Sequence, residues 1–338
     1  MVEKAVGLIR EKHERPYFMW LNPINPHDIC HFAINKLRFG ATLDDKLTRR
    51  LPRLADAMKW PEGVSEKEFL EKYCPLLPAN YEPQQDEPLS IGMLLENRSF
   101  RLSARQEYTE NDWRQHRWAY CRLVELIDRQ IQTVLNAVKE SGQEENTMII
   151  FSSDHGDMDS SHRMEHKSVL YEESANVPFL VMWKNHIAPG RVDSTHLVSS
   201  GLDLLPTVCD YADIHGIADP RGRSLRPLLE GKSVEWRKTL GVESEVGRMV
   251  VDADGCKYIR YNLISEQIEE QLLDRKADPG EMRHFTKDAS HASKLEELRN
   301  AYQTEWFPLE SSQVKGPKDD GDTDTPARKN AKRAKRSK

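Results

Sequence analysis

The chain has 338 residues, of which 38% are hydrophobic and 31% are charged. This composition is typical of one or two globular domains with a sizeable core, and it excludes fibrous, coiled-coil and repeat architectures. The chain carries 49 Lys and Arg against 55 Asp and Glu, and outside residues 311–338 the counts are 40 and 51. Broad nucleic-acid binding needs basic side chains that neutralise phosphates, so we expect no nucleic-acid partner and only a local positive site for any anionic ligand.

Cysteine spacing and apolar runs exclude further classes of protein. The five cysteines form no C-x-x-C pair and no zinc-ribbon spacing, so the sequence predicts neither a disulfide framework nor a structural zinc. Charged residues interrupt the first thirty positions, which argues against a signal peptide in this chain, and no apolar run is as long as a membrane span. We therefore expect no membrane partner, and the chain itself predicts no localisation.

The first third of the chain has one clear helix and one clear strand. Residues 2–13 have the pattern of an amphipathic helix, and the apolar run at 17–21 is typical of a buried strand. His27 would then lie just past the carboxyl end of that strand. Residues 40–108 are rich in proline and show one predicted helix, capped by Ser65, so we expect an irregular insertion there.

The middle of the chain predicts an α/β domain that spans residues 1–235. Apolar residues recur at helical spacing from about Thr109 to Gly142, which predicts a long helix. Residues 147–153 and 177–183 are continuous apolar runs, and such runs suit central strands of a parallel sheet whose two faces are covered by helices. A further helix is expected at 201–208.

The pattern changes after residue 235. Short alternating strands are predicted at 248–252 and 257–262, and a final amphipathic helix follows, so residues 236–310 are expected to form a small α+β subdomain. Residues 311–338 contain almost no apolar side chains and are predicted to be a disordered basic tail. Its positive charges are interpreted as a solvated end of the chain.

The densest polar stretch follows the strand predicted at 147–153. Asp154 and His155 are adjacent, and a carboxylate and an imidazole together can hold a divalent cation. Lys167 can place a compact positive charge against an anionic group near that cation. Ligands of open α/β sheets bind outside the carboxyl ends of strands, which is where this stretch would lie.

Ordinary structural roles explain the same residues equally well when spacing alone is considered. Asp154 can cap the following helix, and His27 can be a turn residue after two prolines. On composition alone, His162 and His166 are interpreted as surface histidines. The spacing therefore leaves both interpretations open.

Several motifs resemble the sulfatases of the alkaline-phosphatase superfamily. The most specific is the run at 149–157, IIFSSDHGD, followed by His162 and Lys167. Other matching motifs occur in the family's order, at 25–27, 170–174, 177–178, 203–207, 223–231 and 272–281. The resemblance covers about residues 17–306, and it implies an alkaline-phosphatase-like sheet flanked by helices and incomplete at its amino-terminal side.

The resemblance also implies roles for individual residues. Asp154 and His155 would be ligands of a divalent metal, with Ca²⁺ expected and Mg²⁺ or Mn²⁺ as alternatives. Lys167 and His27 would be catalytic residues that bind the sulfate, and His162 would contact the substrate, a sulfated small molecule or carbohydrate. A metal ion, an ammonium and an imidazolium together can stabilise the charge that develops when a sulfate ester breaks, and His27 can act as general acid.

The sequence departs from the family pattern near its start. Family members carry an Asp pair that completes the metal site, then C-x-[PA]-S-R, whose cysteine becomes the formylglycine nucleophile, then Lys-x-His. None of these motifs occurs here, and the pair Asp44 and Asp45 follows the Pro-His element instead of preceding it. Two metal ligands are too few for tight binding of a hard cation. We therefore expect a chain that is incomplete or inactive alone, that aggregates through an uncovered sheet edge, and that needs an amino-terminal half as partner.

Two alternatives to a sulfate ester hydrolase remain open at this stage. Phosphonate and phosphodiester hydrolases of the same superfamily resemble the Asp-His-Gly region. A non-catalytic protein that keeps the fold and binds anions through Lys167 and His27 would explain the absent nucleophile. Relatives are often periplasmic or secreted, which does not decide the location of this chain.

Overall fold

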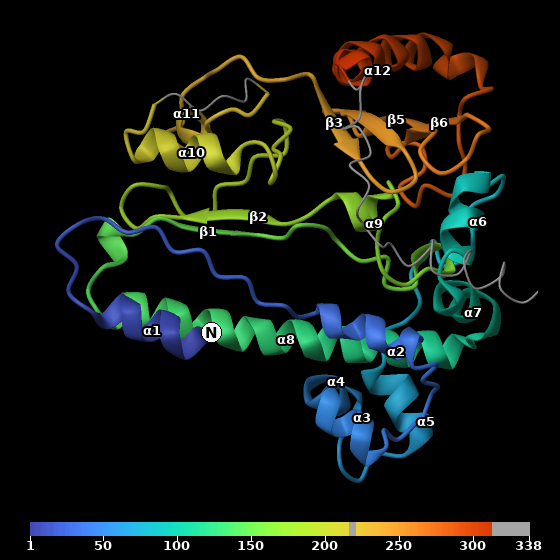
Figure 1. Ribbon diagram of the computed structural model, residues 1–338, viewed down its shortest axis with the longest axis horizontal. Helices are drawn as coiled ribbons and strands as arrows, with labels where there is room; N and C mark the ends of the chain where they lie inside the picture. The colour runs from blue at the N-terminus through green and yellow to red at the C-terminus, as the bar shows by residue number, and fades with distance from the viewer. Residues whose placement is uncertain (216–220, 313–338) are drawn as a thin grey trace, which may run out of the picture.

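One long helix connects the two ends of the molecule. The computed structural model describes residues 1–215 and 221–312, and in it α8 (Glu110–Glu140) runs beneath both sheets (Figure 1). Thr109 starts this helix with a capping box, in which its hydroxyl accepts a hydrogen bond from Asp112 N and the Asp112 carboxylate accepts one from Thr109 N. Helix α1 (Val2–Arg10) packs against the carboxyl-terminal half of α8. Both predicted helices are therefore present.

The segment at 17–21 was expected to be a buried strand, and this expectation is wrong. The chain is extended there but forms no strand, and Phe18 and Trp20 are 65% and 59% exposed. An apolar extended segment becomes a strand only when a neighbour takes up its backbone hydrogen bonds. Within residues 1–215 and 221–312 no strand pairs with it.

Residues 27–107 are more helical than the expected irregular insertion. The Ser65 hydroxyl does cap a helix, by accepting a hydrogen bond from Glu68 N. The helices are too short for a periodic pattern. Apolar side chains of residues 29–58 and 100–108 share one core with α8 around Phe32, Leu54 and Trp113. Ile91, Leu94 and Leu95 belong to a second core. The elements are η1 (His27–Ile29), α2 (Cys30–Ile34), α3 (Asp45–Arg50), α4 (Pro52–Met58), α5 (Glu66–Glu68), the π-helical η2 (Phe69–Tyr73), α6 (Leu89–Glu96) and α7 (Ser99–Glu107).

The first sheet has two strands, β1 (Ile149–Ser152) and β2 (Phe179–Met182). Both strands lie where the sequence predicted them, but they pair antiparallel, with Ile149 opposite Met182, so the predicted parallel arrangement is wrong for this pair. The polar loop between them turns the chain back on itself. The sheet lies between α8 and α10 (Leu204–Tyr211), and the short η3 (Glu144–Asn146) and α11 (Arg226–Leu229) flank it (Figure 1).

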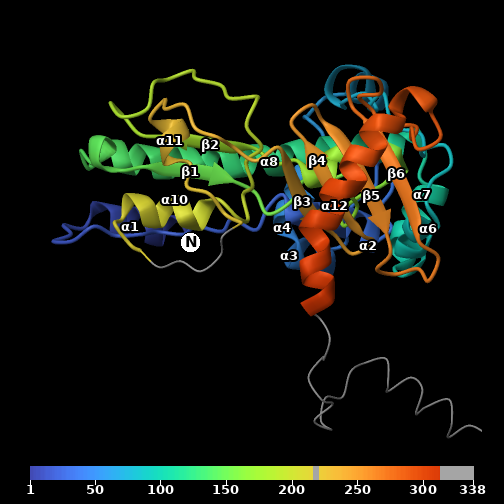
Figure 2. The same cartoon turned by 90° about the horizontal axis from the view of Figure 1, so that it is seen from above.

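The second sheet lies at the other end of the molecule (Figure 2). Its four antiparallel strands have the order β3 (Thr239–Glu243), β4 (Arg248–Asp252), β5 (Cys256–Tyr261) and β6 (Glu269–Asp274). Helix α12 (Ala292–Ser312), preceded by η5 (Ala289–His291), covers one face. The other face packs against the loop that follows β1.

The predicted α/β architecture with helices around a sheet agrees with these elements. The sequence missed β3 and β6, and the boundary between residues 235 and 236 stays a prediction. Most of the predicted tail, residues 313–338, lies outside the described residues. Among the residues that are described, no helix is both long and apolar enough to cross a membrane.

Candidate active site

The loop after β1 passes so close to Glu173 that only glycine fits at residue 156. A Cβ atom on Gly156 would lie 1.9 Å from the carbonyl oxygen of Glu173, so any side chain there would force the two segments apart. Gly156 N donates to the carbonyl oxygen of Ser174, 2.9 Å away. This contact holds the loop against α9 (Glu172–Ala175) and fixes the direction in which Asp154 and His155 leave the strand.

The same loop holds an unusual number of left-handed residues. Six residues other than glycine have positive φ, including His166 (83°) and Ser168 (82°) on either side of Lys167. Such conformations cost about 1–3 kcal/mol each and persist only where the surrounding structure enforces them. Here the hydrogen bond from Met158 N to His166 O (2.7 Å) and the buried side chains of the loop enforce them. The remaining left-handed residues are Asp159, Ser160, His162 and Arg163, of which the last two lie in η4 (Ser161–Arg163).

The structure brings His27 and Lys167 together from distant parts of the chain. Lys167 Nζ lies 3.4 Å from His27 Nδ1, at the start of η1. Partial burial and the neighbouring Lys167 ammonium lower the pKa of His27. The imidazole is therefore neutral at neutral pH, with Nδ1 as acceptor from the ammonium and Nε2–H as donor. This differs from the imidazolium considered from the sequence.

Asp154 and His155 form the second part of the site. His155 Nδ1 lies 2.7 Å from the carbonyl oxygen of Gly156, and because a carbonyl only accepts hydrogen bonds, Nδ1 carries the proton. The lone pair of Nε2 is then free, 3.6 Å from Asp154 Oδ2, and the Asp154 side chain is 86% exposed. A backbone carbonyl that fixes the tautomer in this way is the usual support of a metal-binding histidine.

The metal expected from the sequence fits these two residues but is not fully coordinated by them. Asp154 offers a carboxylate and His155 a free Nε2, on adjacent residues that face solvent. Within residues 1–215 and 221–312, no group of three or more His, Cys, Asp or Glu side chains is arranged to hold a metal ion. The described residues thus supply part of a coordination sphere.

No cysteine near the site has the properties of a nucleophile. Cys30 lies close to Lys167, but it is buried, and burial raises its pKa to about 11. The thiolate is the reactive form of cysteine, and it is scarce at such a pKa. The structure therefore offers no substitute for the absent formylglycine motif at this position.

His162 does not join His27 and Lys167. Its side chain is fully buried and stacks on Tyr171, with ring centroids 4.1 Å apart and an interplanar angle of 12°. Burial lowers the pKa of His162 to about 4. The interpretation as a surface histidine is wrong, and its contact with the substrate stays a prediction.

Two further residues near the site were missed. The ring centroid of His166 lies 6.2 Å from that of His27, and burial together with Lys167 lowers the pKa of His166 to about 3. Glu165 is 5% exposed, and burial and the nearby Asp157 raise its pKa to about 8. No sequence signal marks them, because their burial depends on the irregular left-handed backbone of the loop, which has no periodic pattern.

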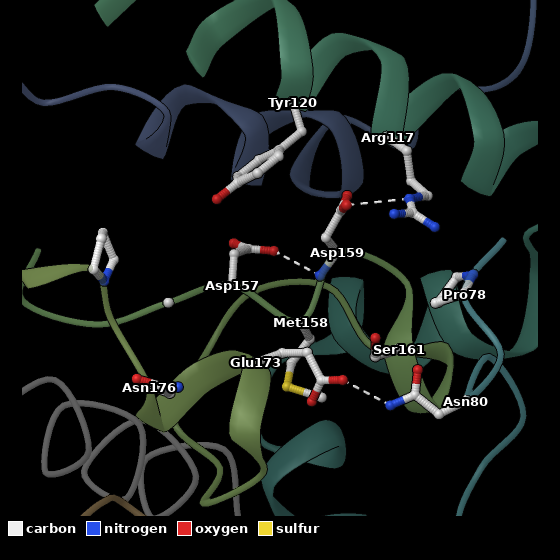
Figure 3. Close-up of a pocket in the computed structure, with 12 residues that line it drawn as sticks. Pro78, Asn80, Arg117, Tyr120, Asp157, Met158, Asp159, Ser161, Glu173 and Asn176 are labelled. Carbon is white, nitrogen blue, oxygen red and sulfur yellow. Dashed lines mark hydrogen bonds and ion pairs between the residues drawn. The ribbon is translucent and has the colours of Figure 1, made fainter. Parts of the chain in front are cut away.

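A pocket of about 450 Å³ adjoins the site loop (Figure 3). Gly156, Asp157 and Asp159 form one wall, and Tyr120 of α8 and Glu173 of α9 form others. Burial raises the pKa of Asp157 to about 6. The pocket therefore places a second group of acidic side chains within a few residues of His155.

Comparison with known proteins places this geometry in a family. Residues 1–214 match the sulfatase family model, and residues 160–305 match the model of the N-sulphoglucosamine sulphohydrolase carboxyl-terminal region. The Δ4,5-hexuronate-2-O-sulfatase of Bacteroides thetaiotaomicron is 28% identical over 88% of the chain and 58% of its own length. The N-acetylglucosamine-6-O-sulfatase of the same organism is 31% identical over 55% of the chain and 35% of its own length.

A solved structure shares the fold as well as the sequence pattern. The chain superposes on a putative sulfatase from Bacteroides thetaiotaomicron with a TM-score of 0.72 and 28% identity, over 90% of this chain and 62% of that one. The chain thus spans 58% of the Δ4,5-hexuronate-2-O-sulfatase and 62% of the solved chain. The matched model covers well over half of the chain, and the motifs around Asp154 and Lys167 lie in the matched region, so the chain belongs to the sulfatase family.

Proposed function

We propose that this chain forms the carboxyl-terminal part of a sulfate ester hydrolase that acts on sulfated carbohydrates. The observation that carries the proposal is the contact between Lys167 and His27, 3.4 Å apart, on loops that also carry His155. The named relatives, a hexuronate-2-O-sulfatase and an N-acetylglucosamine-6-O-sulfatase, support a sulfated sugar as substrate.

Lys167 and His27 would bind the sulfate and stabilise the transition state. The Lys167 ammonium supplies a full positive charge and two further N–H donors beyond the one directed at His27. His27 Nε2–H supplies a neutral donor that can face the leaving oxygen. Negative charge develops on the sulfate oxygens and on the leaving oxygen as the S–O bond breaks. Donors that are already in position therefore stabilise the transition state more than they stabilise the bound substrate.

Asp154 and His155 would hold the divalent metal, with Ca²⁺ as the proposed ion. When bound, the metal would neutralise charge on the sulfate oxygens. His155 is prepared for this role by the hydrogen bond from Nδ1 to Gly156 O, which leaves Nε2 without a proton. Asp154 is free to turn toward the ion because its side chain is 86% exposed.

We propose that an amino-terminal segment supplies the nucleophile and the remaining metal ligands. This proposal is supported by the share of the relatives that the chain spans and by exposed apolar side chains on the first sheet and at residues 17–21. Phe18 and Trp20 are exposed on a segment that pairs with no strand among the described residues, and Leu180 and Met182 of β2 are 58% and 50% exposed. Exposed apolar groups on unpaired extended backbone are typical of a surface that receives further strands.

Complementation tests this function directly. The chain would be combined with the part of the Δ4,5-hexuronate-2-O-sulfatase that it does not match, which is selected to contain the Asp pair and the C-x-[PA]-S-R motif, and assayed on 4-nitrophenyl sulfate and on a 2-O-sulfated hexuronate. We expect turnover by the complex and a loss of at least about 100-fold in Lys167→Ala, because one preorganised charged donor is worth that much.

A matched control separates catalysis from surface charge. Lys184 is also a surface-accessible lysine, paired with Glu144 at 2.8 Å and located past the end of β2 that is opposite the start of β1, so Lys184→Ala should keep full activity. A stable complex without turnover of either sulfate ester would contradict the proposal. Faster turnover of a phosphonate monoester than of both sulfate esters would assign the chain to the other hydrolase class instead.

A further inference from the structure

Four basic side chains cluster on the surface that α3 and α4 form. They are Lys46, Arg49, Arg50 and Arg53, all of them exposed, and we call them the basic face. Residues 46–53 contain no acidic residue, although the whole chain has a net charge of −6. The basic face is therefore a local positive surface on an acidic molecule, and such a surface attracts anionic ligands.

Ion pairs within the protein do not neutralise the basic face. Among residues 1–215 and 221–312, no carboxylate forms an ion pair with any of its four side chains. Two of the acids nearest in sequence have other partners, since Asp44 Oδ1 accepts a hydrogen bond from Leu47 N at 2.7 Å and Asp56 pairs with Lys59 at 2.6 Å. Asp45 remains as the one carboxylate of the α3 helix, against three basic side chains. The positive charge of the basic face is thus available to a ligand.

The arrangement of these charges disfavours the helix that carries them. Arg49 and Arg50 lie three and four positions after Lys46, so like charges are neighbours on the surface of α3, and such pairs destabilise a helix. The following helical segment has the stabilising arrangement instead, because Lys72 lies four positions after Glu68 and pairs with it at 3.0 Å. A polyanion bound to α3 would offset the repulsion, so the charge pattern is an indication of a ligand that does not depend on exposure alone.

The basic face adjoins the element that carries His27. Helix α4 packs against η1, and Ile29 of η1 and Leu54 of α4 belong to the same hydrophobic core. Helix α3 packs in turn against α4, and Figure 1 shows the two helices side by side beneath α8. One packed unit therefore holds both the basic face and the His27 side of the proposed sulfate site.

We propose that the basic face binds the sulfate and carboxylate groups that flank the reacting ester on a sulfated oligosaccharide. The inference rests on the proposed function and adds that the substrate is a chain of several sugars that extends from the sulfate site over α4 and α3. Three of the four side chains are arginines, whose planar guanidinium donates two parallel hydrogen bonds to an oxyanion. A sulfated hexuronate carries both kinds of anionic group that such side chains bind.

Calorimetric titration of the full chain at low salt tests the inference with two probes, a heparin-derived disaccharide and a heparin-derived hexasaccharide. The disaccharide fills only the sulfate site, whereas the hexasaccharide also reaches the basic face. We expect the hexasaccharide to bind at least about tenfold more tightly, since three exposed ion pairs together contribute about that much. The triple variant Arg49→Gln/Arg50→Gln/Arg53→Gln should remove this advantage and leave the affinity for the disaccharide unchanged.

A second triple variant controls for the loss of charge itself. Arg10, Arg129 and Lys184 are also exposed, and each forms an ion pair with a glutamate away from the basic face. Arg10→Gln/Arg129→Gln/Lys184→Gln should therefore keep the wild-type affinity for both probes. Thermal unfolding shows whether the variants are folded, and the basic-face variant should be at least as stable as the wild type because glutamine keeps the helix propensity and removes the repulsion.

Lys167→Ala separates this inference from the proposed function. It should weaken the binding of both probes, because both occupy the sulfate site. Equal affinity of the wild type and the basic-face variant for the hexasaccharide would overturn the inference, and the proposed function would still stand if Lys167→Ala weakens both probes. Hexasaccharide binding that depends on the three arginines but not on Lys167 would overturn the connection to the sulfate site, and no binding of either probe would overturn both proposals.

Discussion

The two ends of the molecule differ in how completely they bury their apolar surface. The four-stranded sheet is covered by α12 on one face and by the site loop on the other, and Leu298 and Ile259 are fully buried there. The two-stranded sheet exposes Leu180 and Met182, and the segment at 17–21 exposes Phe18 and Trp20 and pairs with no strand among the described residues. One end therefore closes its own core, whereas the other has the properties of a surface that awaits additional strands.

The site lies where these two regions meet. The loop after β1 begins on the open sheet and ends packed on the closed one, through Met164, Val169 and Leu170. Lys167 is thus held by packing against the four-stranded sheet, while Asp154, next to the two-stranded sheet, stays exposed. The difference explains how the chain can hold the proposed anion site in place while it supplies only part of the proposed metal site.

We expect the largest loss in the free energy of unfolding at the buried ion pairs that connect α9 to the four-stranded sheet. Lys257 is 1% exposed and forms ion pairs of 2.7 Å with both Glu172 and Glu281. Lys257→Met would leave the buried Glu281 without its cation, whereas Glu172 keeps Arg275 at 2.8 Å, and breaking a buried ion pair costs about 3–5 kcal/mol. Urea unfolding measures this loss, and a change below about 1 kcal/mol would show that the pair contributes little.

A slightly smaller effect is expected in the hydrophobic core of the closed region. Leu298 of α12 is fully buried against the sheet, so Leu298→Ala should reduce the free energy of unfolding by about 2–5 kcal/mol. Leu180→Ala is the matched change on the open sheet, where the side chain is 58% exposed, and it should cost less than about 1 kcal/mol. Equal losses in the two variants would contradict the contrast between the regions.

A pH-dependent change in the free energy of unfolding is expected at Glu165, which is buried in the loop after β1. Burial raises its pKa to about 8, so the folded state binds its proton more tightly than the unfolded state. Its contribution to stability is complete below about pH 4.5 and is lost as the pH rises toward 8. Glu165→Gln should match the wild type at pH 5 and be more stable by roughly 1–3 kcal/mol at pH 8.5. Unfolding curves at both pH values check this. An equal difference between the variant and the wild type at pH 5 and at pH 8.5 would show that Glu165 does not titrate in this range.

The smallest energetic effect is expected on the exposed side chains of the open region. Phe18→Lys and Leu180→Lys should change the free energy of unfolding by less than about 0.5 kcal/mol each, because both side chains already face solvent. They should nevertheless reduce self-association, since charged side chains on an uncovered sheet oppose edge-to-edge pairing. Light scattering at increasing concentration measures this, and unchanged association would show that another surface is responsible.

The sequence predicted best the elements that depend on local pattern. The long helix follows Thr109 as its apolar spacing predicted. Strands β1 and β2 lie on the predicted apolar runs, and β4 and β5 lie on the predicted alternating segments. The segment at 17–21 has the composition of a buried strand but lacks a partner to pair with. Strand formation depends on a neighbour, which the pattern of one segment does not reveal.

The site was predictable only through resemblance. Spacing alone left His27 and Asp154 open to ordinary turn and capping roles, whereas the family motifs singled out both, together with Lys167 and His155. The burial of Glu165 and His166 follows from left-handed backbone in the loop, which residues other than glycine do not signal. The acidic pocket depends on Glu173 and Arg117, which are far apart in the sequence and carry no shared motif.

Sulfate titration followed by the NMR signals of the histidine side chains tests the central claim most directly. If Lys167 and His27 form an anion site, sulfate should shift the resonances of His27 and His166 in a saturable way. Lys167→Ala should abolish these shifts, and Lys184→Ala should leave them unchanged. Shifts of equal size and affinity in the wild type and in Lys167→Ala would contradict the account.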